Sequence, residues 1–348
     1  MGNFESLSLS GNSLIFAGAA VAVWIAGTKM AKYADEIADR SGIGEALIGI
    51  FLLAGVTSLP EIATSFTAAQ SGDAPLAINN LLGSIAMQVA VLAVADLIYG
   101  KSALTSIVPN PVVMLQGALN ICLLTFVAVA VVVGDFAVFG IGIWSWGLGL
   151  GALYSFKKLV DARGRKPWIA NLGDDKPGDA DERQKEDYGS LSLLIVKTLI
   201  AGVTILLAGF FVARSGAALA NQTGLGSSFM GVAFVAIATS LPEVSTVFAA
   251  MRRGLYTMAI SDIFGTNILN VALIVGVDAI APGPPVLDRV GEFSIIGALL
   301  GVAVTGIFLI GIIERRDRTI GRMGVDSAAV LVTYAGGLVL LFSMRHAV

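Results

Sequence analysis

Long apolar runs alternate with short polar segments along the whole chain. A helix needs about 20 predominantly apolar residues, with a range of about 17–25, to cross the hydrocarbon core of a bilayer. Runs of this kind predict ten spans, at residues 13–33, 44–70, 74–98, 109–133, 136–158, 192–213, 227–251, 256–280, 293–313 and 325–344. The pattern therefore predicts an all-α polytopic membrane protein with ten transmembrane helices.

The composition is typical of a membrane protein and argues against several classes of function. Of the 348 residues, 56% are hydrophobic and 14% are charged, whereas soluble domains carry about 25% charged residues. The single histidine, His346, and the single cysteine, Cys122, leave no basis for histidine catalysis, a His/Cys metal site or an internal disulfide. The sequence also lacks a nucleotide-binding loop and a soluble domain. We therefore expect no enzyme activity, no cofactor and no nucleic-acid partner; the lipid bilayer is the expected surrounding.

One long polar segment, residues 161–190, predicts a solvated linker between an N-terminal five-helix half (1–160) and a C-terminal five-helix half (191–348). Lysine and arginine accumulate in cytoplasmic loops, so they indicate the orientation. With the N-terminus outside, 19 of the 22 basic residues fall on inner segments. We therefore expect a multi-pass protein of the cell membrane with both termini outside and the linker in the cytoplasm.

A five-residue motif occurs twice at an offset of 182 residues, as Thr57-Ser58-Leu59-Pro60-Glu61 and as Thr239-Ser240-Leu241-Pro242-Glu243. Further identities at this offset extend over residues 43–96 and 225–278. Because each half has an odd number of predicted helices, the second half must enter the membrane in the opposite sense. An inverted-topology repeat of this kind is common among secondary transporters.

Each motif places an acidic side chain beside a helix break. An ionisable side chain at the bilayer centre costs about 2.5–3.5 kcal/mol on insertion scales, so a duplicated one indicates a function rather than a simple packing kink. Proline clashes with the carbonyl four residues earlier, which frees carbonyl oxygens near Ala54 and Ala236. Carboxylate, hydroxyl and carbonyl oxygens are hard ligands that suit Na⁺ or Ca²⁺. The two segments therefore predict one paired cation site.

The helix after each motif adds a polar face. Residues 80, 84 and 88 are four apart and share one face, as do residues 262, 266 and 270. These side chains can complete the oxygen shell of the cation site, or they can serve as hydrogen bonds between helices. Asp96 and Asp278 lie near the ends of the same two helices, where the pattern favours interfacial charges.

The duplicated motif, followed about twenty residues later by a helix of the G-N-x-x-G-S type, resembles the cation/Ca²⁺ exchanger superfamily and, within it, the compact prokaryotic Na⁺/Ca²⁺ exchangers. The resemblance is specific over residues 43–96 and 225–278. It implies ten helices in two inverted halves, with helices 2, 3, 7 and 8 forming the ion-binding core. It further implies Ca²⁺ and Na⁺ as transported ions and a transporter that works as a monomer.

The resemblance also assigns roles to residues. Glu61 and Glu243 are the implied shared carboxylates for Ca²⁺ and Na⁺. The remaining implied ligands are the hydroxyl or carbonyl oxygens of Thr57, Ser58, Thr239 and Ser240, the carbonyls of Ala54 and Ala236, the hydroxyls of Ser84 and Thr266, and the side chains of Gln88 and Asn270.

Several positions depart from the family pattern. Gln88 replaces an asparagine, Asn270 stands where an acid is frequent, and Asp262 lies elsewhere on the same helix face. Gly83 and Gly265 stand where Ca²⁺/H⁺ exchangers carry a glutamate, which argues against that branch. The leading hypothesis is a secondary antiporter that exchanges Na⁺ for Ca²⁺. Ca²⁺/H⁺ or another cation antiport is the alternative, followed by a cation channel or a membrane scaffold without transport.

Overall fold

The computed structural model describes residues 4–41, 54–99, 102–108, 110–165 and 190–345. Its helices are α1 (Leu9–Ser41), α2 (Ala54–Thr57), α3 (Leu59–Gln70), α4 (Ala74–Tyr99), α5 (Pro111–Val133), α6 (Ile143–Arg165), α7 (Leu191–Thr223), α8 (Gly226–Phe229), α9 (Ala236–Thr239), α10 (Leu241–Arg252), α11 (Tyr256–Ile280), α12 (Glu292–Glu314) and α13 (Val325–Met344). A π-helical stretch, η4 (Met230–Val235), and the short 3₁₀ turns η1 (Phe4–Ser6), η3 (Leu104–Ser106) and η5 (Val286–Arg289) complete the helical elements. Two antiparallel hairpins pair β1 (Ala137–Val138) with β2 (Ile141–Gly142) and β3 (Thr319–Ile320) with β4 (Met323–Gly324).

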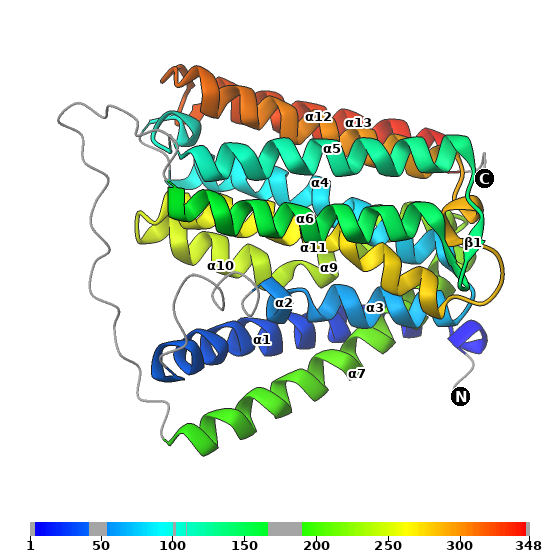
Figure 1. Ribbon diagram of the computed structural model, residues 1–348. Coiled ribbons are helices and arrows are strands. Elements are labelled where there is room, and N and C mark those ends of the chain that lie inside the picture. Colours follow the sequence, from blue (N-terminus) through cyan, green and yellow to red (C-terminus); the bar gives the residue numbers. More distant parts are fainter. Residues whose placement is uncertain (1–3, 42–53, 100–101, 109, 166–189, 346–348) are drawn as a thin grey trace.

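The long helices lie side by side in an elongated bundle (Figure 1), with α1 and α7 together along one side and α5, α12 and α13 along the other. Within the described residues, seven helices are long and apolar enough to cross a membrane, and the bent pair Gly226–Thr239 and Leu241–Arg252 makes an eighth candidate. A polytopic helical membrane protein is therefore confirmed. The count of ten spans stays a prediction for two reasons. Part of the predicted span 44–70 lies outside the described residues, and α6, which corresponds to the predicted span 136–158, is not among the candidate spans.

The two halves repeat element by element. The offset of 182 residues that relates the motifs also relates α3 to α10, the start of α4 to that of α11, and the hairpin β1–β2 to the hairpin β3–β4. The related helices α1 and α7 are antiparallel: Gln222, near the end of α7, donates to the carbonyl of Leu7 at 2.8 Å and accepts from Asn12 at 3.2 Å. Antiparallel packing of equivalent helices is what an inverted repeat requires.

Proline explains where the helices of the two motifs break. Pro60 and Pro242 lie at the first turns of α3 and α10, where a missing backbone N–H costs nothing. The preceding short helices, α2 and α9, end at Thr57 and Thr239, and the second pair bends by 50°. The breaks therefore lie at the predicted positions, one residue before each proline-containing helix begins.

Close backbone contact between the halves depends on Gly83. A Cβ atom on Gly83 of α4 would lie 2.4 Å from the carbonyl oxygen of Val232 in the π-helical stretch. No side chain fits such a contact, because the neighbouring atoms belong to backbone. The equivalent Gly265 of α11 has open space, since its nearest neighbour is an atom of Gln116 at 3.7 Å.

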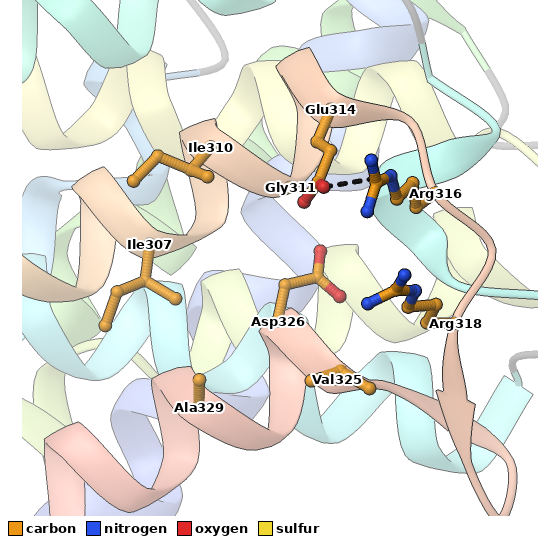
Figure 2. Close-up of a pocket in the computed structure, with 9 residues that line it drawn as sticks. All are labelled: Ile307, Ile310, Gly311, Glu314, Arg316, Arg318, Val325, Asp326 and Ala329. Carbon is orange, nitrogen blue, oxygen red and sulfur yellow. Dashed lines mark ion pairs between the residues drawn. The ribbon is translucent and has the colours of Figure 1, made fainter.

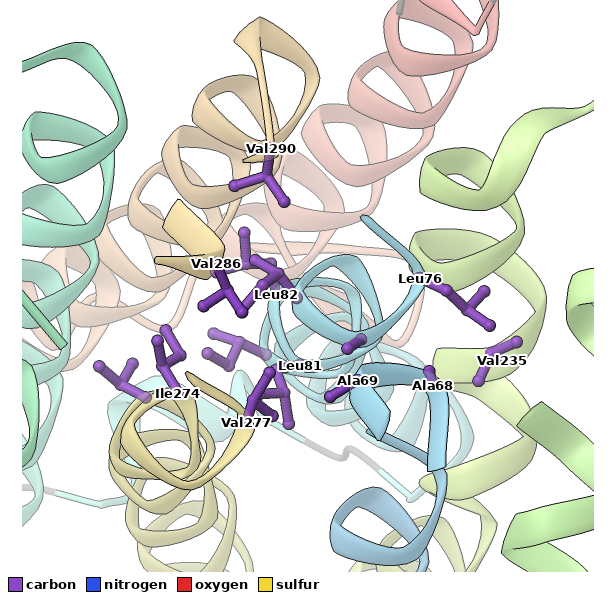
Figure 3. Close-up of a cluster of buried hydrophobic side chains, with 14 of the residues drawn as sticks. Ala68, Ala69, Leu76, Leu81, Leu82, Val235, Ile274, Val277, Val286 and Val290 are labelled. Carbon is purple, nitrogen blue, oxygen red and sulfur yellow. The ribbon is translucent and has the colours of Figure 1, made fainter. Parts of the chain in front are cut away.

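The apolar core lies around α4 and α11 (Figure 3). Leu81 and Leu82 of α4 lie with Ile274 and Val277 of α11, whereas Leu76 of α4 lies toward Val235, and all six are at most 1% exposed. In a bilayer such contacts stabilise by close packing, since lipid chains are as apolar as leucine. Large apolar side chains such as Leu14 (75%) and Val332 (73%) are exposed on the outside of the bundle. Packing thus fixes α4 and α11 as the centre of the protein.

Asp96 and Asp278 are not interfacial charges, so that prediction was wrong. Both are buried at the ends of α4 and α11. Asp96 accepts hydrogen bonds from the backbone N–H of Leu104 (3.0 Å) and of Gly324 (2.8 Å). Asp278 accepts the equivalent pair, from Val286 (2.9 Å) and Gly142 (2.8 Å). Each aspartate therefore joins its own half to the hairpin of the other half.

Candidate functional site

The predicted site residues lie on the broken helices α2–α3 and α9–α10 and on the central helices α4 and α11. All of their described side chains are fully buried, with 0% exposure at Thr57, Ser58, Glu61, Ser84, Gln88, Thr239, Ser240, Glu243, Thr266, Asn270 and Ala236. Ala54 begins α2. Buried polar side chains at this density are rare in a membrane helix bundle unless they have a function.

Hydrogen bonds join the first motif to the second. The hydroxyl of Ser240 donates to Oε1 of Glu61 at 2.7 Å, and Nε2 of Gln88 donates to the same hydroxyl oxygen at 3.2 Å. Thr239 lies 3.3 Å from the carbonyl of Ala236 and 3.2 Å from Oδ1 of Asn80. One polar network therefore combines a carboxylate of one half with the hydroxyls of the other, as a shared site requires.

The two glutamates are neighbours in this network. Glu243 interacts electrostatically with Glu61 and, more weakly, with Asp262. Like charges repel strongly where water is excluded, because the local dielectric constant is low. A cation between Glu61 and Glu243 would turn this repulsion into attraction.

Many oxygens of the site have no hydrogen-bond partner within the described residues. They are Ser58 Oγ, Glu61 Oε2, Ser84 Oγ, Gln88 Oε1, both carboxylate oxygens of Glu243, Thr266 Oγ1 and Asn270 Oδ1. Each buried unpartnered group costs about 1–3 kcal/mol, so the set rivals the whole net stability of a protein, about 5–15 kcal/mol. Ca²⁺ takes about 6–8 oxygen ligands, and a bound cation would offset this cost.

The alternative role predicted for the polar faces, hydrogen bonding between helices, is present. Nδ2 of Asn80 donates to the hydroxyl of Ser65 at 2.9 Å, so Asn80 links α4 to α3 through a hydrogen bond. Ser84 on the same face has an unpartnered hydroxyl and suits the cation site. Thr266 and Asn270 are buried on α11, and neither the Thr266 hydroxyl nor the Asn270 amide has a hydrogen-bond partner within the described residues.

Three polar residues of the region were not predicted from the sequence as part of the site: Ser65, Thr246 and Asn267. Thr246 donates to Asp262 at 3.2 Å, and Asn267 donates to the carbonyl of Ile85 at 3.4 Å. Ser65 and Thr246 lie one turn after the motifs, so their spacing from the glutamates was the available signal.

A surface cavity of about 260 Å³ lies elsewhere, at the hairpin end of α12 and α13 (Figure 2). Its lining includes Ile307, Ile310, Arg318 and Asp326 and none of the predicted site residues. The ion pair at its edge joins exposed Glu314 and Arg316 at 3.0 Å and contributes at most about 1 kcal/mol. The cavity therefore belongs to the protein surface and not to the cation site.

The sequence is similar to those of known proteins over both halves of the chain. The family model of the sodium/calcium exchanger protein matches residues 12–159 and 193–343. CaxA of Alkalimonas amylolytica is 25% identical over 94% of this chain and 98% of its own length. The sodium/calcium exchanger MaX1 of Methanosarcina acetivorans is 25% identical over 72% of this chain and 77% of its own length.

Solved structures show the same fold. The sodium-calcium exchanger NCX_Mj, soaked with Na⁺ and Sr²⁺, superimposes with a TM-score of 0.60 at 18% identity, over 95% of this chain and 99% of the other. YfkE superimposes with a TM-score of 0.61 at 17% identity, over 94% and 92% of the two chains. The match of the family model over both halves confirms the resemblance noted in the sequence. The chain belongs to the sodium/calcium exchanger protein family.

Proposed function

We propose that the chain exchanges Na⁺ for Ca²⁺ by alternating access at the site between the two motifs. Its family supports the proposal, since it implies a transporter of the cation/Ca²⁺ antiporter type. The observation that carries the proposal is the burial of Glu61 and Glu243 together, one from each half, with three of their four carboxylate oxygens unpartnered within the described residues.

The repeat supports alternating access. Because the second half repeats the first in antiparallel order, the site has equivalent surroundings toward both membrane faces. A rearrangement that opens the site on one side therefore has a counterpart that opens it on the other. The backbone carbonyls of Ala54 and Ala236 and the hydroxyls of Thr57 and Thr239 are the proposed neutral ligands toward each side. The helix break does not free the carbonyl of Ala236, which accepts the backbone N–H of Ser240 at 3.1 Å.

The number of acidic side chains at the proposed site affects how Na⁺ transport is coupled to Ca²⁺ transport. Glu61 and Glu243 supply two negative charges, which balance one Ca²⁺ or two Na⁺. Asn270 is neutral, so a third Na⁺ would depend on hydroxyl and carbonyl oxygens such as those of Ser84 and Thr266. The proposed exchange therefore has a low Na⁺ affinity and carries less net charge than a site with a third acid at position 270.

Exchange of Ca²⁺ for H⁺ is the second candidate, and one observation favours it. The repulsion between Glu61 and Glu243 can be relieved by a proton on either carboxylate as well as by a metal cation. Against it, Gly83 has no room for the side chain that the Ca²⁺/H⁺ branch carries there.

The coupling ion can be tested in proteoliposomes. ⁴⁵Ca²⁺ uptake is measured with an outward Na⁺ gradient at equal pH, and with a pH gradient in the absence of Na⁺. The proposal predicts uptake with the Na⁺ gradient only. Uptake with the pH gradient alone would replace Na⁺ by H⁺ as the coupling ion, and uptake that needs no counter-ion would indicate a channel.

A further inference from the structure

We propose that Glu243, Thr246 and Asp262 form a second cation site, displaced from the paired glutamates toward the turn between α10 and α11. The inference rests on the proposed function, since the displaced site would hand a hard cation, Ca²⁺ or Na⁺, to or from Glu243. We call these three residues the displaced site.

Thr246 links Asp262 of α11 to the backbone of Glu243 in α10. Its hydroxyl lies 2.9 Å from the backbone carbonyl oxygen of Glu243, one turn earlier in the same helix, and 3.2 Å from Oδ2 of Asp262. A hydroxyl has one proton and two lone pairs, so it cannot donate fully to both oxygens and keeps acceptor capacity for a cation. The arrangement supplies hydroxyl, carboxylate and carbonyl oxygens, which are the ligands of hard cations.

Within the described residues, no basic side chain balances the negative charge of the displaced site. Glu243 is 0% exposed, and neither of its carboxylate oxygens has a hydrogen-bond partner within the described residues. Asp262 interacts with Glu243 electrostatically, and no lysine or arginine in the described part of the chain forms an ion pair with it. A cation between the two carboxylates would relieve their repulsion.

The repeat provides an internal comparison. Asn80 occupies the position equivalent to Asp262, and there the amide is fully buried and bonded on both atoms, to Ser65 and Thr239. In the second half the partner is lost, because Val247 replaces Ser65. Asp262 also retains partial exposure. The acid therefore does not repeat the structural role of Asn80, and the site exists in one half only.

The position of Asp262 separates it from the central site. Asp262, Thr266 and Asn270 share one face of α11, and a separation of eight residues corresponds to about 12 Å along a helix. Asp262 thus does not replace an acid at position 270. It lies near the start of α11, close to the turn that carries Arg252 and Arg253, which the distribution of basic residues assigns to the cytoplasmic side.

The site is tested with Asp262→Asn in proteoliposomes of known orientation. Removing one charged ligand is expected to raise the apparent KM for Ca²⁺ about tenfold on the cytoplasmic side, while the KM on the outer side stays unchanged. Asp262→Glu is expected to restore most of the affinity, because it keeps the carboxylate. Glu314→Gln removes an exposed acid on the same predicted side and is expected to change neither KM.

A KM that is unchanged on both sides, or raised equally on both, would overturn the displaced site. Thermal unfolding of purified Asp262→Asn checks the fold; if this variant unfolds early, Asp262→Glu and Asp262→Ser carry the same comparison of KM. Glu243→Gln separates the two hypotheses. Lost exchange in Glu243→Gln with a normal Asp262→Asn refutes only the displaced site, whereas normal exchange in Glu243→Gln refutes the proposed function.

Discussion

At the scale of residues, the proposed cation site depends on two glutamates. Glu61 has one hydrogen bond, from Ser240, and Glu243 has none to its carboxylate within the described residues. A ligand that binds only the folded state raises its stability in proportion to the logarithm of its concentration. Binding at these carboxylates should therefore be measurable without transport.

Ca²⁺ should raise the unfolding temperature of the purified protein, and Glu61→Gln or Glu243→Gln should abolish the rise. An amide supplies only a dipole where a dehydrated divalent ion needs charge, so affinity should fall at least about 100-fold. Both variants should fold, because each removes a repelling charge. Differential scanning fluorimetry over a Ca²⁺ series measures the effect. A rise of wild-type size in either variant would remove that glutamate from the site.

Asn270→Asp should strengthen cation binding or change the preferred ion. The substitution adds a third acid to the face of α11 that carries Thr266. We expect about a tenfold gain in apparent Na⁺ affinity and more charge moved per exchange cycle. ⁴⁵Ca²⁺ exchange at set membrane potentials measures both quantities. Strongly electrogenic exchange in the wild type, unaltered by Asn270→Asp, would show that position 270 does not set the coupling.

The motif residues could be predicted from the sequence because the repeat marks them twice, and a buried carboxylate is too costly to occur twice by accident. The partners of Asn80 could not be predicted. Whether an amide lines a site or bonds to Ser65 depends on how α3 and α4 pack against each other. Asp96 and Asp278 were misjudged for the same reason, since one backbone partner of each, Gly324 and Gly142 respectively, lies on a hairpin that is distant in sequence.

At the scale of elements, equivalent positions of the two halves act as controls for each other. Gly83 and Gly265 occupy equivalent positions, but only Gly83 touches the π-helical stretch η4. Gly83→Ala should lower the free energy of unfolding by about 1–3 kcal/mol through overpacking. Gly265→Ala should be neutral or slightly stabilising, because alanine favours a helix. Thermal unfolding in detergent compares the stability of the two variants. Equal destabilisation by Gly83→Ala and Gly265→Ala would contradict the asymmetric contact.

The buried aspartates at the ends of α4 and α11 should also behave alike. Asp96→Ala leaves the N–H groups of Leu104 and Gly324 without their acceptor, at about 1–3 kcal/mol each. Asp278→Ala should cost a similar amount, and Asp161→Ala at an exposed position should cost little. The unfolding temperatures of the three variants test this prediction. Wild-type stability of Asp96→Ala and Asp278→Ala would mean that these hydrogen bonds do not hold the hairpins.

At the scale of the whole molecule, orientation is the open prediction. Ten spans with both termini outside place position 11 outside and position 179 in the cytoplasm. Single cysteines at these positions, in a background that replaces the exposed Cys122, can be probed with an impermeant thiol reagent. Gly11→Cys should react in intact cells, and Asp179→Cys should react only after permeabilisation. The reverse pattern would invert the orientation and assign the displaced site to the outer face.

The helix pattern predicted the architecture well because lipid imposes one rule on all spans: apolar length. Where a span is broken, as at Pro242, or where its first part lies outside the described residues, as in 44–53, the number of crossings does not follow from the described helices alone. The match of the family model over both halves confirms the transporter family.

The central claim is that Glu61 and Glu243 together bind the exchanged Ca²⁺. Its most direct test is Na⁺-gradient-driven ⁴⁵Ca²⁺ uptake by proteoliposomes that contain wild type, Glu61→Gln, Glu243→Gln or the control Glu314→Gln. We predict uptake by the wild type and the control, and no uptake above empty liposomes by either site variant. Wild-type uptake by correctly folded Glu61→Gln and Glu243→Gln would contradict the claim.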